Sequence, residues 1–170
     1  MNDTIVLSKK PILVAIAVAV AIAVAVAVGM IGGLATEIGP WYRALVKPWW
    51  QPPDWLFGPV WTMIYIFTGM AGVRAWRLGN DRQRKLFVVA LTINCLLNIA
   101  WSVLFFNLQR PDHAFTEVIA LWLSVALLVV LPWPYSKRSS ALLLPYLIWV
   151  SIAAYLNWTI VELNGPFTAG

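Results

Sequence analysis

The chain has 170 residues, of which 61% are hydrophobic and only 11% are charged, and its formal net charge at pH 7 is +5. Soluble domains carry about 25% charged residues, so this chain has too few polar side chains to cover a soluble fold, which excludes that class. The basic residues lie between apolar segments, a pattern typical of anchoring at a membrane surface, which argues against nucleic acid as a partner. We therefore predict an all-α integral membrane protein.

Five apolar stretches are long enough to cross a bilayer, which takes about 20 mostly apolar residues in a helix. They predict a bundle of five transmembrane helices in a single membrane domain over residues 1–170. The first stretch, residues 12–34, alternates Val or Ile with Ala, but a lone strand cannot satisfy its backbone in lipid. A cleaved signal peptide is the alternative, and the length of the apolar run argues against it. The other spans are expected at residues 55–77, 86–108, 115–135 and 140–161.

The segment between the first two spans is rich in Trp and Pro and reads WYRALVKPWWQPPDWLFGPVW over residues 41–61. Its prolines remove backbone N–H donors and fix φ, so the segment cannot be one continuous helix. Trp prefers positions with one apolar and one wet side. We predict that residues 36–54 form a lid over a ligand site, and a connector that only anchors the chain at the interface is the alternative.

Lysine and arginine are distributed unevenly between the two ends of the expected spans. Nine lie on one side and three on the other. The positive-inside rule then places the N-terminus in the cytoplasm and the C-terminus and the lid outside. A bacterial membrane fits this bias better than a mitochondrial outer membrane. The larger set is Lys9, Lys10, Arg74, Arg77, Arg82, Arg84, Lys85, Lys137 and Arg138, and the smaller set is Arg43, Lys47 and Arg110.

Aromatic and amide side chains fall on single faces of several spans, toward the side of the lid. An amide facing lipid would be unfavourable, so these faces should point into the bundle. They predict an aromatic cup with a few amides, roofed by the lid, although Asn94 and Asn98 could instead only join helices. The residues that share faces at helical spacing are Trp61 and Tyr65, then Asn94, Asn98, Trp101 and the adjacent Ser102, and then Tyr146, Trp149, Ala153 and Asn157.

Few groups in the sequence support conventional catalysis or metal binding. The single Cys95 excludes an intramolecular disulfide and a cysteine-based zinc site, and the single His113 excludes bis-histidine haem ligation within one chain. We expect no metal and no cofactor. Asp112 and His113 are interpreted as part of a turn, and Glu117 is expected to face water at the end of its span.

Three motifs match one known family in order and spacing. They are KPWWQPP with its flanking aromatic residues, LNIAWSVLFF in the third span, and LLLPYLIW followed by YLNW in the last span. They resemble the TspO/translocator family, which includes the tryptophan-rich sensory proteins of bacteria and the peripheral-type benzodiazepine receptor of mitochondria. The resemblance covers residues 36–164 and leaves the first span unmatched.

The resemblance implies a five-helix bundle, usually a homodimer in the lipid membrane, that binds porphyrins, sterols or benzodiazepine-like ligands under the first loop. It also implies an alternative function, light-dependent porphyrin degradation, in which Trp61 and Trp149 would be the catalytic residues. The positions that match the ligand pocket of the family are Tyr42, Pro52, Trp61, Tyr65, Asn98, Trp101, Ser102, Trp149 and Ala153.

One departure from the family concerns its proposed sterol motif near the end of the last span. No Lys or Arg follows Tyr155, which argues against a sterol role through that element. No acid, base or metal constellation supports chemistry in the dark, and five spans cannot divide into two equal transporter repeats. The leading expectation is a membrane receptor or sensor for porphyrin-type tetrapyrroles, with a light-dependent enzyme and a transporter as alternatives.

Overall fold

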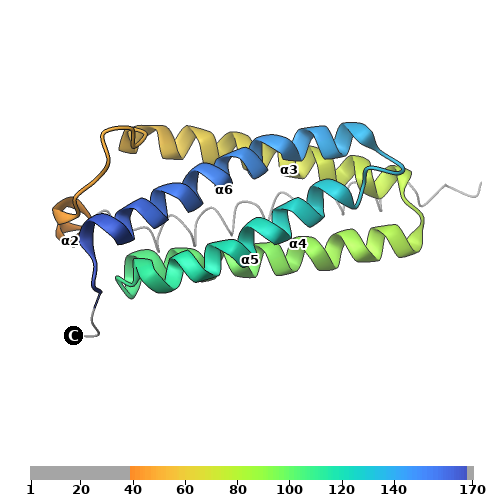
Figure 1. Ribbon diagram of the computed structural model, residues 1–170. Coiled ribbons are helices and arrows are strands. Elements are labelled where there is room, and N and C mark those ends of the chain that lie inside the picture. Colours follow the sequence, from red (N-terminus) through yellow and green to blue (C-terminus); the bar gives the residue numbers. More distant parts are fainter. Residues whose placement is uncertain (1–38, 168–170) are drawn as a thin grey trace, which may run out of the picture.

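A computed structural model describes residues 39–167 of the chain (Figure 1). Over this range the regular structure is entirely helical. The predicted span at residues 12–34 and the first part of the predicted lid lie outside the described residues. The elements are α2 (Pro40–Ala44), α3 (Asp54–Leu78), α4 (Asp81–Ser102), the π-helix η1 (Val103–Asn107), α5 (Pro111–Val130) and α6 (Lys137–Asn164).

Four of these helices are long and apolar enough to cross a membrane: α3, α4 with η1, α5 and α6. This confirms the predicted all-helical class and a bundle with several membrane spans. The count of five spans stays a prediction, since it depends on residues 12–34.

The ends of the helices follow local sequence signals. Asn80 caps α4 through a capping box, in which its side chain accepts from the Gln83 amide at 3.0 Å and Gln83 accepts from the Asn80 amide at 2.8 Å. α5 begins at Pro111. Proline suits the first position of a helix, because the N–H group that it lacks would have no hydrogen-bond partner within the helix. α5 ends at Val130, earlier than the expected boundary at residue 135, because Pro132 and Pro134 cannot continue a helix.

α6 is the helix that ties the bundle together, because it packs along both α5 and α3, while α4 packs chiefly on α5. In Figure 1 the helices run roughly along one common direction, and α2, the η1–α5 turn and the end of α6 gather at the same end. We call this the loop end. The α3–α4 and α5–α6 connections lie at the opposite end. The hydrophobic core that contains Tyr42, Phe105 and Leu156 therefore lies at the loop end.

Exposed tryptophans occur at both ends of the bundle. Trp49 in the loop is 95% exposed and Trp55 at the start of α3 is also exposed. At the opposite end, the Arg84 guanidinium lies 5.6 Å from the Trp76 ring centre, and the Lys137 ammonium lies 5.7 Å from that of Trp133. Trp at both membrane–water interfaces, with cations beside it, is typical of membrane-spanning bundles.

The chain between α4 and α5 has an irregular backbone. The π-helix η1 follows α4 directly, and Gln109 then adopts a φ of 53°, a left-handed conformation that is uncommon for a residue other than glycine. A π-turn changes the direction of the side chains that follow it, and such turns are frequent at functional sites. Here it directs both Phe105 and Phe106 toward α2.

Candidate functional site

One aromatic cluster joins α3 to α6, and we call it the α3–α6 cluster. Phe57 meets Trp149 edge-to-face with ring centres 5.4 Å apart. One turn later, Trp61 stacks on Tyr65 at 5.5 Å and meets the ring of Tyr146 edge-to-face at 5.9 Å. Trp149 and Tyr146 are buried, whereas Trp61 and Tyr65 keep part of their surface exposed. The cluster therefore presents large flat rings without being fully enclosed.

A second aromatic cluster, the α2–α4 cluster, lies at the loop end. Trp101 stacks on Phe105 with ring centres 5.3 Å apart, and Trp41 meets Phe105 edge-to-face at 6.0 Å. The rings of Tyr42 and Phe106 are in contact, with their centres 5.6 Å apart. Trp101 also packs against the hydrophobic core to which the α3–α6 cluster belongs, so the two clusters form one continuous aromatic region.

Buried amides connect the helices beside this region. The Tyr146 hydroxyl donates to Asn94 Oδ1 at 3.1 Å and accepts from Asn98 Nδ2 at 3.4 Å. Asn94 Nδ2 in turn donates to Ser124 Oγ at 2.8 Å, which links α4 to α5. The Ser102 hydroxyl donates to the Asn98 carbonyl at 3.2 Å. Both the oxygen and the nitrogen of the Asn94 side chain thus bond to neighbouring helices. This supports the alternative in which Asn94 only joins helices.

A third buried amide, that of Asn157, contacts Trp101. The indole N–H of Trp101 donates to Asn157 Oδ1 at 3.0 Å, and Asn157 Nδ2 donates to the Pro111 carbonyl at 2.8 Å. These two bonds join α4, α6 and the first residue of α5.

The chain around α2 is held together by polar contacts centred on Tyr42. Its hydroxyl donates to Asp54 Oδ1 at 3.2 Å, and Gln51 Nε2 lies 3.3 Å from both oxygen atoms. The Lys47 ammonium lies 3.6 Å from the centre of the Tyr42 ring. Burial, with the Asp54 carboxylate adding to it, raises the pKa of Tyr42 to about 12. Tyr42 therefore remains a neutral hydrogen-bond donor throughout the physiological pH range.

The loop of residues 45–53 is held against the C-terminal half of α6 at two places, Asn164 and Tyr155, which together we call the latch. The Val46 amide donates to Asn164 Oδ1 at 2.7 Å, and Asn164 Nδ2 donates to the Val46 carbonyl at 2.9 Å. The Trp50 ring stacks on Tyr155 with centres 5.0 Å apart and an angle of 17° between planes. The loop thus lies against the same helix that carries Trp149.

The structure brings most of the predicted site residues into the aromatic region. Tyr42 and Trp101 belong to the α2–α4 cluster, and Trp61, Tyr65 and Trp149 belong to the α3–α6 cluster. Of the remaining four, Asn98 and Ser102 are buried on α4, and Asn98 bonds to Tyr146 of the α3–α6 cluster, whereas Pro52 in the loop and Ala153 on α6 are half-buried.

Several residues of this region were not predicted from the sequence. Phe57 and Phe105 each lie four residues from a predicted Trp, and that helical spacing was a usable signal. Phe106 lies in the π-helix η1, five residues after Trp101, and α-helical spacing does not indicate that these two rings meet. Asn164 and Val46 are 118 residues apart in the chain, and no local pattern indicates their pairing.

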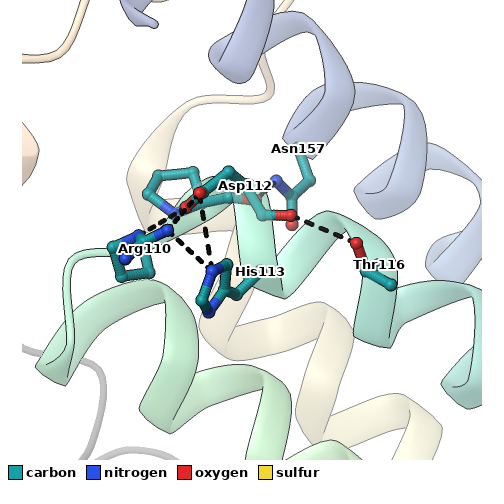
Figure 2. A network of polar contacts seen from close by, with 6 residues as sticks. Arg110, Asp112, His113, Thr116 and Asn157 are labelled. Carbon is teal, nitrogen blue, oxygen red and sulfur yellow. Dashed lines mark hydrogen bonds and ion pairs between the residues drawn. The ribbon is translucent and has the colours of Figure 1, made fainter. Parts of the chain in front are cut away.

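Two expectations for α5 were wrong. Asp112 and His113 lie in the first turn of the helix rather than in a turn before it. The Arg110 guanidinium donates to both Asp112 oxygens, at 2.8 and 2.5 Å (Figure 2). Glu117 does not face water, because both of its carboxyl oxygens are buried and have no hydrogen-bond partner within residues 39–167.

The buried carboxyl of Glu117 predicts a stabilising substitution. A buried polar group without a partner costs about 1–3 kcal/mol, so Glu117→Leu should raise the free energy of unfolding by about 1 kcal/mol or more. Thermal unfolding of the purified protein in one detergent would measure this. Glu162→Leu, at an exposed position on the neighbouring helix α6, is the matched control and should change stability little. A lower melting temperature for Glu117→Leu would contradict this account.

Comparison with known proteins shows the family to which the chain belongs. Residues 19–163 match the TspO/MBR family, so the match also includes most of residues 12–34, which the motifs alone had left unmatched. The chain is 42% identical over 125 residues to the tryptophan-rich protein TspO of Chlorobaculum tepidum, covering 73% of this chain and 79% of the relative. It is 34% identical to the tryptophan-rich sensory protein of Cereibacter sphaeroides, over 73% of this chain and 77% of that one.

Similarity extends to animals. The human translocator protein is 30% identical over 132 residues, which cover 76% of this chain and 78% of the human protein. The sequence matches extend over most of the chain. The four helices that are long and apolar enough to cross a membrane are consistent with a membrane-protein family. The chain belongs to the TspO/MBR family of membrane proteins.

Proposed function

We propose that this chain is a membrane receptor or sensor that binds porphyrin-type tetrapyrroles at the aromatic region beneath the loop. The observation that carries the proposal is the continuity of the two aromatic clusters, to which α2, α3, α4 with η1, and α6 all contribute. Flat apolar ligands suit sites lined by Trp and Tyr, with a few polar groups that fix orientation. The name of the Cereibacter sphaeroides relative, a sensory protein, fits this function.

Ligand entry in this proposal requires the loop to move. Tyr42 is buried against Phe106, and Trp50 is stacked on α6, so the loop and α2 cover the loop end of the aromatic region. The loop then acts as a lid that opens for exchange and closes over the bound ligand, as active-site loops do. The residues we propose to contact the ligand are the pocket positions named from the resemblance.

A light-dependent enzyme is the second candidate function. It is favoured by the placement of Trp61 and Trp149 in one aromatic cluster, where both indoles would lie close to one bound porphyrin. Porphyrin transport is the third candidate function, which the name of the human relative, translocator protein, fits.

The test mixes the purified protein with protoporphyrin IX and records absorbance and fluorescence spectra in the dark and under illumination. A stable, saturable complex in both conditions supports the receptor. Bleaching to a new absorbing species that requires both light and protein supports the enzyme. Uptake of porphyrin into proteoliposomes tests transport. Absence of saturable binding would contradict the proposed function.

We also propose the orientation of the bundle, from the nine-to-three division of Lys and Arg. The loop end then faces outside and the α3–α4 connection faces the cytoplasm. In a bacterial host, a reporter active only outside the cytoplasm should be active when fused at Gly170 and inactive within residues 79–83. The reverse pattern of activity would show that the bundle is inserted the other way round.

A further inference from the structure

We propose that Asn157 is a positioning residue of the ligand site, which fixes the indole of Trp101 by anchoring it to the first residue of α5. The inference rests on the proposed function, since it gives the orientation of Trp101 a role in ligand stacking.

Both polar groups of Asn157 are used, and their partners determine the orientation of the amide. Its oxygen accepts from the Trp101 indole at 3.0 Å, and its nitrogen donates to the Pro111 carbonyl at 2.8 Å. Exchanging oxygen and nitrogen would place donor against donor and acceptor against acceptor. Asn157 is only 1% exposed, so water cannot replace either partner.

The Pro111 carbonyl is itself held in place. Pro111 is the first residue of α5 and its ring fixes φ. It stands between Arg110 and Asp112, which form a two-bond ion pair, and the Arg110 guanidinium also lies 2.7 Å from His113 Nε2. Figure 2 shows Asn157 reaching from α6 toward this network. The anchor for Asn157 is therefore a rigid helix start.

These contacts hold the indole ring of Trp101 in one orientation. The indole stacks on Phe105 with an angle of 29° and meets Phe106 nearly at right angles, at 85° with centres 6.0 Å apart. Rotation of the ring would break its hydrogen bond to Asn157 and both aromatic contacts together. A ligand that stacks on a fixed ring loses less conformational entropy on binding than one that must first order it.

A second amide in the same bundle provides the comparison that separates positioning from helix joining. Asn94 also links helices through buried hydrogen bonds, to Ser124 and Tyr146, but makes none to a tryptophan. Ser124→Ala removes a hydrogen bond between α4 and α5 and leaves Trp101 and its partner intact. It is the matched control for substitutions at Asn157.

The experiment uses the full chain in nanodiscs, labelled with ¹⁵N-tryptophan, with Trp101→Phe to assign the Trp101 indole resonance. Asn157→Leu should shift this resonance upfield, as expected for a lost hydrogen bond, and leave the other indole resonances in place. It should weaken protoporphyrin IX binding about tenfold, equivalent to about 1.4 kcal/mol. Ser124→Ala should leave the resonance unmoved and affinity within about twofold, well under 1 kcal/mol.

A double-mutant cycle provides the decisive comparison. In the Trp101→Phe background, Asn157→Leu should have no further effect on affinity, because residues that act as a unit are not additive. An equal loss in both backgrounds, or an unmoved Trp101 resonance, would overturn the inference. If Asn157→Leu does not fold, Asn157→Ala gives the same readouts, since it also lacks the oxygen that accepts from the Trp101 indole and the nitrogen that donates to the Pro111 carbonyl. Failure of the parent to bind porphyrin would instead count against the proposed function, because the resonance reports the hydrogen bond without ligand.

Discussion

Replacing Trp61 or Trp149 with Phe should lower the affinity for protoporphyrin IX about tenfold in each case, while the helical content stays that of the parent. Each Phe keeps an apolar ring in the α3–α6 cluster but loses the indole N–H and part of the stacking area. Aromatic pairs contribute about 0.5–1.5 kcal/mol beyond area burial, so a reduced ring and lost area together account for about 1.4 kcal/mol.

Trp133→Phe is the control for these substitutions. Trp133 is exposed at the opposite end of the bundle, beside Lys137, and has no contact with either aromatic cluster. Its replacement should leave porphyrin affinity at the parent value. If Trp61→Phe and Trp149→Phe bind and bleach porphyrin as the parent does, the α3–α6 cluster is not the ligand site.

Asn164→Ala should speed dissociation of bound porphyrin about tenfold and leave the apo melting temperature nearly unchanged. The substitution removes both hydrogen bonds between α6 and the Val46 backbone. At about 0.5–1.5 kcal/mol per bond, their loss destabilises the closed loop by about 1–3 kcal/mol. The helices retain their own packing, so the loop should open more often without unfolding of the bundle. Stopped-flow recovery of tryptophan fluorescence would measure the dissociation rate.

The matched control for the latch is Thr159→Val. The Thr159 hydroxyl donates to the Tyr155 carbonyl at 2.8 Å within α6, and makes no bond to the loop. Its replacement removes a side-chain hydrogen bond near the same end of the same helix and should leave the dissociation rate unchanged. A parent-like rate in Asn164→Ala, or a collapse of its apo stability, would show that these bonds do not control ligand exchange.

The sequence predicted the helices of the bundle because their physical cause is local. An apolar run of about 20 residues in lipid must form a helix to satisfy its backbone. The apolar run continues through Pro132 and Pro134 to residue 135, whereas α5 ends at Val130, because proline cannot continue a helix. The π-helix η1 has no such signal, since one extra residue in a turn leaves the apolar composition unchanged.

The aromatic region was predicted in part. Helical spacing placed Asn98 and Trp101 on one face of α4, and Tyr146 and Trp149 on one face of α6. Spacing within one helix cannot show which neighbour a side chain meets. The pairing of Trp101 with Asn157, the latch at Asn164, and the burial of Glu117 depend on how helices distant in sequence pack together.

The proposed function depends most directly on where porphyrin lies in the bundle. Nuclear Overhauser contacts between protoporphyrin IX and assigned indole N–H protons, measured on the parent protein in nanodiscs, would locate it. We predict contacts to Trp61 and Trp149, and none to Trp76 or Trp133 at the opposite end. Contacts confined to Trp76 and Trp133 would place the ligand away from the loop and contradict the proposed site.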